Sequence, residues 1–199
     1  AFAAAWPGAD VVNLLEDSLS PDRARKEEIT DALVGRIATL TAYARQIGSD
    51  AVLFTCSAFG RAIEQAAETV DIPVLKPNEA MFEAAIRQGG KTAMLYTFPP
   101  ARAGMEVEFR EEAARIDPGA VLESFLVEGA IEAVRAGDVE SHNRLVASAA
   151  AGLEGFDSIV LAHFSTARAV PAVRAVTDIP VLSSPDAAID KLKRLLGAA

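Results

Sequence analysis

The sequence predicts an α/β fold made of two pseudo-symmetric halves with parallel sheets. Short runs rich in Val, Ile and Leu alternate with longer helical patterns, which is the order of βαβ units. A stretch of 38 residues, 50–87, also recurs 107 positions later as residues 157–194. Ten aligned positions are identical, among them the Ile-Pro-Val-Leu runs that start at Ile72 and Ile179. One α/β unit is therefore expected to fold twice and to pack about a pseudo-twofold axis.

The predicted strands are near-continuous apolar runs, as expected for strands buried on both faces of a parallel sheet. In chain order they cover residues 10–15, 51–55, 72–75, 92–97, 121–127, 158–162 and 179–182. The clearest helical patterns between them cover residues 26–47, 130–153, 167–176 and 186–196. His142, in the second of these helices, is expected to be a solvated surface residue because its neighbours are polar.

The first half of the sequence lacks a counterpart for the leading strand of the second half. Pro7-Gly8-Ala9 corresponds to Pro118-Gly119-Ala120, and in the second half a strand and a helix precede that motif. We therefore expect that the numbered sequence omits an N-terminal strand. The predicted domains are residues 1–90, the first half without that strand, and residues 91–185, the second half. The C-terminal helix, residues 186–199, could pack back on the first half.

Composition narrows the classes of function. The 199 residues carry a formal net charge of −9, which argues against a surface for nucleic acid or anionic membrane. No apolar run approaches the ~20 residues of a transmembrane helix, and a single cysteine excludes an internal disulfide and is consistent with the cytoplasm. With two histidines, no metal site is expected. No glycine-rich phosphate motif follows a strand, so a nucleotide cofactor is unsupported.

The repeat aligns the one cysteine, Cys56, with His163. Both follow predicted strands and precede helical turns, and ligands of open parallel sheets bind beyond this carboxyl end of the strands. Free backbone N–H groups there favour a bound carboxylate and the reactive thiolate form of a cysteine. Each residue also has a purely structural explanation. Cys56 could fill space in the core, and His163 could be a hydrogen-bonded residue between the halves.

Further polar residues lie at the carboxyl ends of predicted strands, where they could bind a substrate carboxylate or cap the next helix. Capping is favoured for Asn78 and Ser184, because each stands where a helix can begin. Both roles stay open for Ser18, Thr97 and Ser183. The basic stretch Arg23–Lys26 is expected at the surface.

These motifs resemble the aspartate/glutamate racemase superfamily, which includes hydantoin racemases, maleate isomerases and arylmalonate decarboxylases. The resemblance rests on LFTCSAFG around Cys56, VLAHFSTARA around His163 and the Ile-Pro-Val-Leu run before the final helix, and it covers essentially the whole chain. It implies two flavodoxin-like domains with the active site in a central cleft. It also implies no cofactor, a small carboxylate substrate and, in many members, a homodimer.

In members with two cysteines, one thiolate removes the proton α to a carboxylate and the other thiol supplies a proton on the opposite face. The first cysteine corresponds to Cys56 and the second to His163, where this sequence departs from the pattern. The resemblance thus implies Cys56 and His163 as catalytic residues. The implied substrate contacts are Ser57, Ala58, Thr97, Ser165 and Thr166.

The first hypothesis is a racemase or isomerase that moves a proton at the carbon α to a carboxylate of a small acid or amino acid. Cys56 and His163 would form an unequal acid/base pair, since imidazole titrates near neutrality. Three alternatives stay open. Cys56 alone could protonate the enediolate left by decarboxylation of a malonate-type acid. Cys56 could instead attack an unsaturated diacid as a nucleophile, or the chain could bind a small acid without catalysis.

Overall fold

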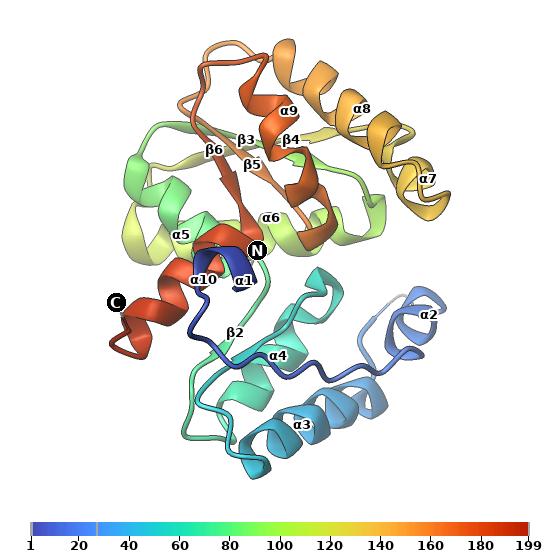
Figure 1. The fold of residues 1–199 in the computed structure, drawn as a ribbon, viewed down its shortest axis with the longest axis vertical. Helices are drawn as coiled ribbons and strands as arrows, with labels where there is room; N and C mark the ends of the chain where they lie inside the picture. The colour runs from blue at the N-terminus through green and yellow to red at the C-terminus, as the bar shows by residue number, and fades with distance from the viewer. Residues whose placement is uncertain (1, 27, 199) are drawn as a thin grey trace.

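Two parallel β-sheets, each with its own helices, make up the computed structural model, which describes residues 2–26 and 28–198 (Figure 1). The larger sheet has the strand order β4-β3-β5-β6. Its strands are β3 (Lys91–Tyr96), β4 (Val121–Leu126), β5 (Ser158–Leu161) and β6 (Val181–Ser183). All pairs are parallel, and Leu95 of β3 lies opposite Phe125 on one side and Leu161 on the other. The central strands are buried on both faces, as their apolar sequences predict.

Helices cover both faces of this sheet. Alternate residues of its strands point to opposite sides, and the apolar side chains on each side are buried against helices. Ala93 and Leu95 pack in one core with α7 (Ala130–Arg135), α8 (Val139–Ala151) and α9 (Val170–Arg174). Met94 and Tyr96 pack in the other core with α5 (Glu79–Gln88) and α6 (Arg102–Ile116). Short 3-10 turns, η2 (Pro99–Ala101) and η3 (Phe164–Ala169), connect strands to the helices that follow them.

The first half is built around a smaller sheet of β1 (Val52–Leu53) and β2 (Val74–Leu75). It carries α2 (Leu19–Ala24), α3 (Asp31–Gln46), the turn η1 (Ser57–Phe59) and α4 (Gly60–Ala67). Apolar residues of α3 and α4 meet in its core, among them Leu33, Ile37, Phe59 and Ile63. Thr30 begins α3, since its side chain accepts a hydrogen bond from the Leu33 amide at 3.4 Å.

Two helices lie between the halves: α1 (Phe2–Ala5) and α10 (Ser184–Leu195) (Figure 1). Helix α10 packs against α5 and also contacts α1. Helix α5, which the predicted boundary assigns to the first half, packs on the sheet of the second. The domain boundary at residue 90 stays a prediction. Within the described part of the chain, no helix is long and apolar enough to cross a membrane.

The predicted α/β class with parallel sheets is confirmed, but one predicted strand is wrong. Residues 10–15 are extended chain without strand pairing, and their backbone exchanges no hydrogen bond with the backbone of another described residue. The physical reason is the lack of a partner, since an extended segment needs a neighbouring strand for stability. The strands of the smaller sheet are correspondingly shorter than predicted.

The structure also corrects two predictions about helices. The helix predicted over residues 130–153 is two helices, because Gly137 takes a positive φ of 75° and Asp138 then caps α8 by accepting the Ser141 amide at 2.9 Å. His142 is fully buried, not solvated, because the face of α8 that carries it packs toward the sheet. The parts of predicted ranges that fall on residues 1, 27 and 199 lie outside the described residues.

Candidate functional site

The candidate site begins with two turns that follow equivalent strands of the repeat. Cys56 follows β1 in extended conformation and leads into η1 and α4. His163 follows β5 and leads into η3. Its φ is +72°, and it is the one non-glycine residue of the described chain with a positive φ. Such a backbone is strained for a residue with a Cβ atom, and strain of this kind gathers at functional sites.

A side-chain contact joins the two turns across the halves. Ser57 Oγ lies 3.3 Å from Nδ1 of His163, within hydrogen-bond distance. The repeat aligns Cys56 with His163, but it is the next residue, Ser57, that contacts the imidazole. The structure therefore brings the turn of the thiol and the turn of the imidazole together.

Burial controls the protonation of His163. It lowers the pKa of His163 to about 4, because the charged imidazolium would lose its hydration. The imidazole is therefore neutral at pH 7. Its Nε2 atom is sealed from solvent and has no hydrogen-bond partner among the described residues. If the Ser57 hydroxyl donates to Nδ1, Nε2 carries the proton and is a donor; in the other tautomer Nε2 is a base.

The Cys56 side chain is half-buried against the core of the first half. It also lines a groove of about 310 Å³ between residues 12–16 and residues 51–56. All residues that line this groove belong to the first half, and His163 is not among them. Cys56 thus lines this groove, while the next residue along the chain, Ser57, contacts His163.

The remaining predicted substrate contacts lie in the same turns or at neighbouring strand ends. The Ala58 carbonyl accepts a hydrogen bond from Nε of Arg23 at 3.2 Å, so a half-buried arginine expected at the surface braces the turn after Cys56. Thr97 is buried at the end of β3, and Thr166 is buried in η3 with no partner for its hydroxyl among the described residues. Ser165 is half-buried in η3.

The predicted capping role of two residues is wrong. Asn78 and Ser184 each stand at the start of a helix, but neither side chain makes a capping hydrogen bond. The Ser184 hydroxyl instead donates to Oδ1 of Asn78 at 2.7 Å, and both residues are fully buried. They link the N-termini of α5 and α10, which occupy equivalent places in the repeat. Two other candidates bond locally, Ser18 to Glu16 at 2.7 Å and Ser183 to Asp186 at 2.7 Å.

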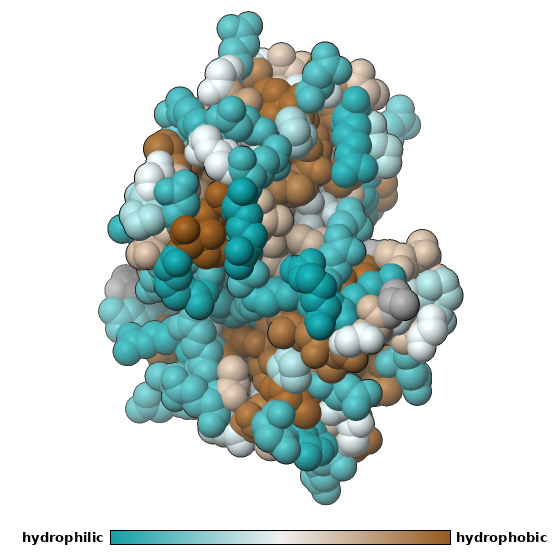
Figure 2. All heavy atoms as spheres, turned by 90° about the vertical axis from the view of Figure 1, so that its left-hand side faces the viewer, coloured by the Kyte–Doolittle hydropathy of each residue, from teal (hydrophilic) through white to brown (hydrophobic). Residues whose placement is uncertain are grey.

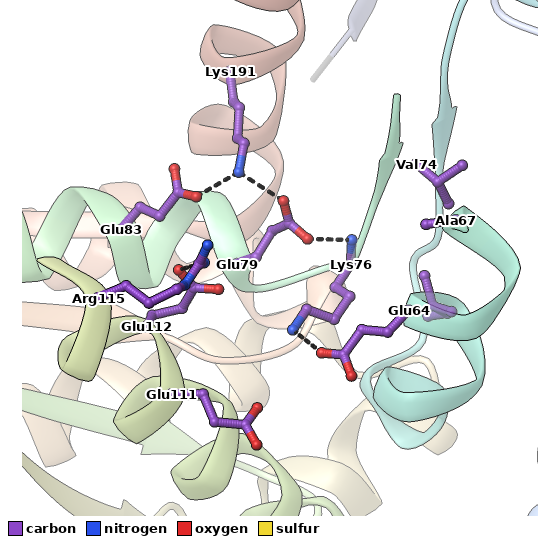
Figure 3. Close-up of a pocket in the computed structure, with 11 residues that line it drawn as sticks. Glu64, Ala67, Val74, Lys76, Glu79, Glu83, Glu111, Glu112, Arg115 and Lys191 are labelled. Carbon is purple, nitrogen blue, oxygen red and sulfur yellow. Dashed lines mark hydrogen bonds and ion pairs between the residues drawn. The ribbon is translucent and has the colours of Figure 1, made fainter. Parts of the chain in front are cut away.

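A cluster of charged residues that no sequence pattern predicted lies between the halves (Figure 3). Nζ of Lys76 lies 2.5 Å from Oε1 of Glu64 in the first half and 3.7 Å from Oε1 of Glu108 in α6. Lys191 of α10 reaches Glu79 at 2.7 Å and Glu83 at 2.5 Å, as Figure 3 shows. These residues come from four helices and a loop, so no local pattern could have identified them.

Two members of this cluster are deeply buried. The side chains of Lys76 and Glu108 are 8% and 9% exposed. Burial raises the pKa of Glu108 to about 7, although the Lys76 ammonium opposes the shift. Lys76 has a raised pKa, because attraction to Glu108 and Glu64 outweighs its own desolvation. Glu108 therefore takes up a proton at a much higher pH than an exposed glutamate does.

Metal ligands do not gather in the described ranges, 2–26 and 28–198, in any group of three or more His, Cys, Asp or Glu side chains that could hold an ion. The chemistry available at the two turns is that of a thiol, a neutral imidazole, hydroxyl groups and backbone amides. These groups can transfer a proton and can hold a carboxylate by hydrogen bonds.

Comparisons with known proteins bear on the fold. No protein-family model matches the sequence, and a search of curated proteins finds no match. Among solved structures, a glutamate racemase from Bacillus anthracis aligns at a TM-score of 0.65 and 15% identity, over 82% of this chain and 65% of its own. An arylmalonate decarboxylase variant aligns at 0.60 and 19% identity, over 84% and 76% of the two chains. An aspartate racemase from Picrophilus torridus aligns at 0.60 and 16% identity, over 90% and 76%.

These structures share one two-domain α/β fold, and the expected resemblance to it is confirmed. The chain spans 65% of the length of the Bacillus anthracis racemase. At these identities the likeness establishes the fold and leaves the reaction to the residues of the site.

Proposed function

We propose that this chain, which has the fold of the aspartate/glutamate racemase superfamily, catalyses proton transfer at the carbon α to a carboxylate of a small acid. The observation that carries the proposal is the meeting of the Cys56 and His163 turns through the Ser57 hydroxyl. Two groups able to exchange a proton thus follow equivalent strands of a duplicated unit. That arrangement suits a reaction in which a proton leaves one face of a carbon and another arrives on the opposite face.

In the proposed reaction, one group removes the proton from the α carbon. The electron pair of the C–H bond moves into the carboxylate to form an enediolate. The second group then delivers a proton to the opposite face of the same carbon. Backbone amides of the turns at Ser57 and Ser165 would hold the carboxylate oxygens and stabilise the charge that develops on them.

The low pKa of His163 sets the form from which the proposed reaction starts. At neutral pH the imidazole is neutral, so it can accept the α proton while the Cys56 thiol donates one. This turnover leaves a Cys56 thiolate and a His163 imidazolium, and loss of the imidazolium proton to solvent with uptake of a proton by the thiolate restores the starting forms. The proposed enzyme is therefore an isomerase or racemase with two unequal groups.

Decarboxylation of a malonate-type acid is the second candidate, and the same neutral imidazole favours it. Loss of CO₂ breaks the C–C bond and leaves its electron pair in an enediolate. A single donor, the Cys56 thiol, then protonates the carbon. A neutral His163 would need only to offer a hydrogen bond to the enediolate from Nε2, in the tautomer that carries the proton there.

One proton NMR experiment separates these candidates. Small dicarboxylates, amino acids and substituted malonates are incubated with the protein in D₂O. Loss of the Cα–H signal with an intact carbon skeleton indicates racemisation or isomerisation, whereas conversion to a deuterated monoacid indicates decarboxylation. Saturable binding without exchange or turnover would contradict both and would support a small-acid binding protein.

Substitutions then test the assigned groups. We expect Cys56→Ser to lower turnover by about 10²–10⁴-fold, the contribution typical of a general acid or base. His163→Asn should have a comparable effect on racemisation, because Asn tolerates the positive φ but transfers no proton. His142→Asn is the matched control, since it removes the other buried histidine outside the turns. Full activity of His163→Asn would reject the two-group mechanism and leave chemistry by Cys56 alone.

A further inference from the structure

A second pocket lies between α5 and α10, the two helices that occupy equivalent places in the repeat. The buried Asn78–Ser184 hydrogen bond joins these helices near their N-terminal ends. Further along the same contact, residues of α5 within 80–87 and residues of α10 within 191–195 line a pocket of about 420 Å³. Figure 2 faces this side of the molecule and shows hydrophilic residues along the junction between the halves. Each copy of the repeat therefore supplies one wall of the pocket.

The lining of this pocket is basic, although the protein is acidic with a net charge of −9. Three of the lining side chains are cations, Arg87, Lys191 and Arg194, and one, Glu83, is a carboxylate. The Lys191 ammonium is compensated within the protein, because it reaches Glu79 at 2.7 Å and Glu83 at 2.5 Å. The positive charge that is left in the pocket is that of the two arginines.

The guanidinium groups of Arg87 and Arg194 are unused by the rest of the fold. Neither side chain makes a hydrogen bond or an ion pair with another residue in the part of the chain that the structure describes. By contrast, Arg36 and Arg115 each reach a carboxylate. Two cations on the walls of one pocket repel each other, and an anion between them turns this repulsion into attraction. The pocket thus has the electrostatic character of an anion site.

The repeat retains both arginines at one equivalent position. Arg87 and Arg194 form one of its ten identical pairs, and Ala80 and Ala187 form another. Ala80 lines the pocket, and its small side chain leaves room for a ligand. An arginine in the last turn of a helix also compensates the partial negative charge of that helix end. That role accounts for each arginine separately, but it does not account for their place on a shared pocket.

We propose that this pocket binds a small oxyanion with two negative charges, either a phosphoryl group or a pair of carboxylates, held by Arg87 and Arg194. A guanidinium group presents a planar fork of N–H donors that matches two oxygens of a phosphate or a carboxylate. Two such groups compensate a dianion, whereas a monoanion leaves one positive charge over. None of the residues that line the pocket belongs to the turns at Cys56 and His163, so the inference does not rest on the reaction proposed above.

Isothermal titration calorimetry and thermal unfolding of the intact chain test this site. Inorganic phosphate and succinate are added at constant ionic strength and about pH 8, where both are dianions, and chloride and acetate are the monoanion controls. We expect saturable heat and a rise in Tm with at least one dianion and with neither monoanion. The dianion that binds more tightly identifies the source of the charge. Equal effects of dianions and chloride would mean that salt merely screens the arginines, and would overturn the proposal.

Substitutions locate the bound anion. Arg87→Gln and Arg194→Gln should each weaken binding about tenfold, as loss of a charge-assisted hydrogen bond does, and the double variant should show no saturable heat. Arg135→Gln is the matched control, because Arg135 is also an exposed arginine in the last turn of a helix, α7, and lies outside the pocket. Glu83→Gln should instead tighten binding, since it removes the carboxylate from the lining.

The variants also separate this pocket from the two turns. An anion bound at Cys56 and His163 would bind the double arginine variant as well as the wild type, and that result would overturn the proposal. An equal loss of binding in Arg135→Gln, or weaker binding in Glu83→Gln, would do the same. None of these measurements depends on turnover, so failure here leaves the proposed reaction untouched.

Discussion

At the scale of single residues, His163 combines three unusual properties. It has a left-handed backbone, a buried Nε2 with no hydrogen-bond partner among the residues that the structure describes, and a pKa lowered by burial. An unpaired buried polar atom costs stability, so a residue of this kind is expected where function requires it. The Ser57 contact engages the ring at Nδ1, so in the proposed reaction Nε2 is the nitrogen left to act on the substrate.

The lowered pKa makes a prediction about acid stability. The folded protein keeps His163 neutral down to about pH 4, whereas the unfolded chain binds a proton near pH 6.5. Between these values the unfolded state holds more protons, so His163 makes stability rise with pH and fall on acidification. The full effect below pH 4 is about 3 kcal/mol.

Urea unfolding of the wild type and His163→Asn between pH 4 and pH 7 measures this effect. The wild type should lose stability relative to the variant as the pH falls through the window from 6.5 to 4. A constant difference between the two proteins across that window would show that His163 is not desolvated in the folded state.

At the scale of elements, the start of β3 depends on a glycine. Gly90 has φ +78°, and a Cβ atom there would overlap the carboxylate of Asp157, which accepts the Lys91 amide. Gly90→Ala should therefore strain the backbone and also displace Asp157. Gly137→Ala is the matched control, because its φ is +75° and its Cβ would meet open space. Urea unfolding measures the free energy of unfolding. We expect it to fall by about 1 kcal/mol in the control and by roughly 2–4 kcal/mol in Gly90→Ala. Equal losses would contradict the role of Asp157.

The contact between α5 and α10 rests on a buried pair. Ser184→Ala should destabilise the protein by about 2 kcal/mol, because it leaves the buried Oδ1 of Asn78 without its donor. A double-mutant cycle with Asn78→Ala isolates the interaction energy between the two side chains from the packing that each substitution removes. This coupling energy should be about 1 kcal/mol. Additive losses in the free energy of unfolding would mean that the two side chains do not interact in solution.

At the scale of the whole molecule, a buried charge cluster connects the halves. Glu108 has a pKa of about 7 when folded and 4.5 when unfolded. The folded state holds more protons between these values, so Glu108 makes stability fall as the pH rises from 4.5 to 7. The charged groups that face it are Lys76, Glu79, Glu112 and Glu64.

Glu108→Gln should therefore gain stability relative to the wild type as the pH rises from 4.5 to 7, by up to roughly 3 kcal/mol. Unfolding in urea at several pH values measures the difference, and Glu111→Gln, an exposed position on the same helix, is the control. The pH dependences of stability that Glu108 and His163 cause have opposite signs. Glu108→Gln should therefore show the rise with pH due to His163, and His163→Asn the fall with pH due to Glu108. A pH-independent difference between Glu108→Gln and the wild type would contradict the buried carboxyl.

Much of the fold was predictable because its signals are local or repeated. Apolar runs at strand length specify β3 and β5, and the repeat aligns Cys56 with His163. Residues 10–15 carry the same apolar signal, but strand formation depends on a neighbouring strand, and no described segment pairs with them. His142 was misjudged for a similar reason, because its neighbours along the chain are polar while the face it shares with Val146 and Ala150 is buried.

The sequence by itself determined the α/β class, the duplication and the two strand ends at which Cys56 and His163 stand. Spacing along the chain encodes all three. Tertiary structure alone decided that Ser57 contacts His163, that Asn78 pairs with Ser184 and that Lys76 and Glu108 are buried together. These contacts join residues 30 or more positions apart, and their energies depend on distance and burial, which exist only once the halves pack against each other.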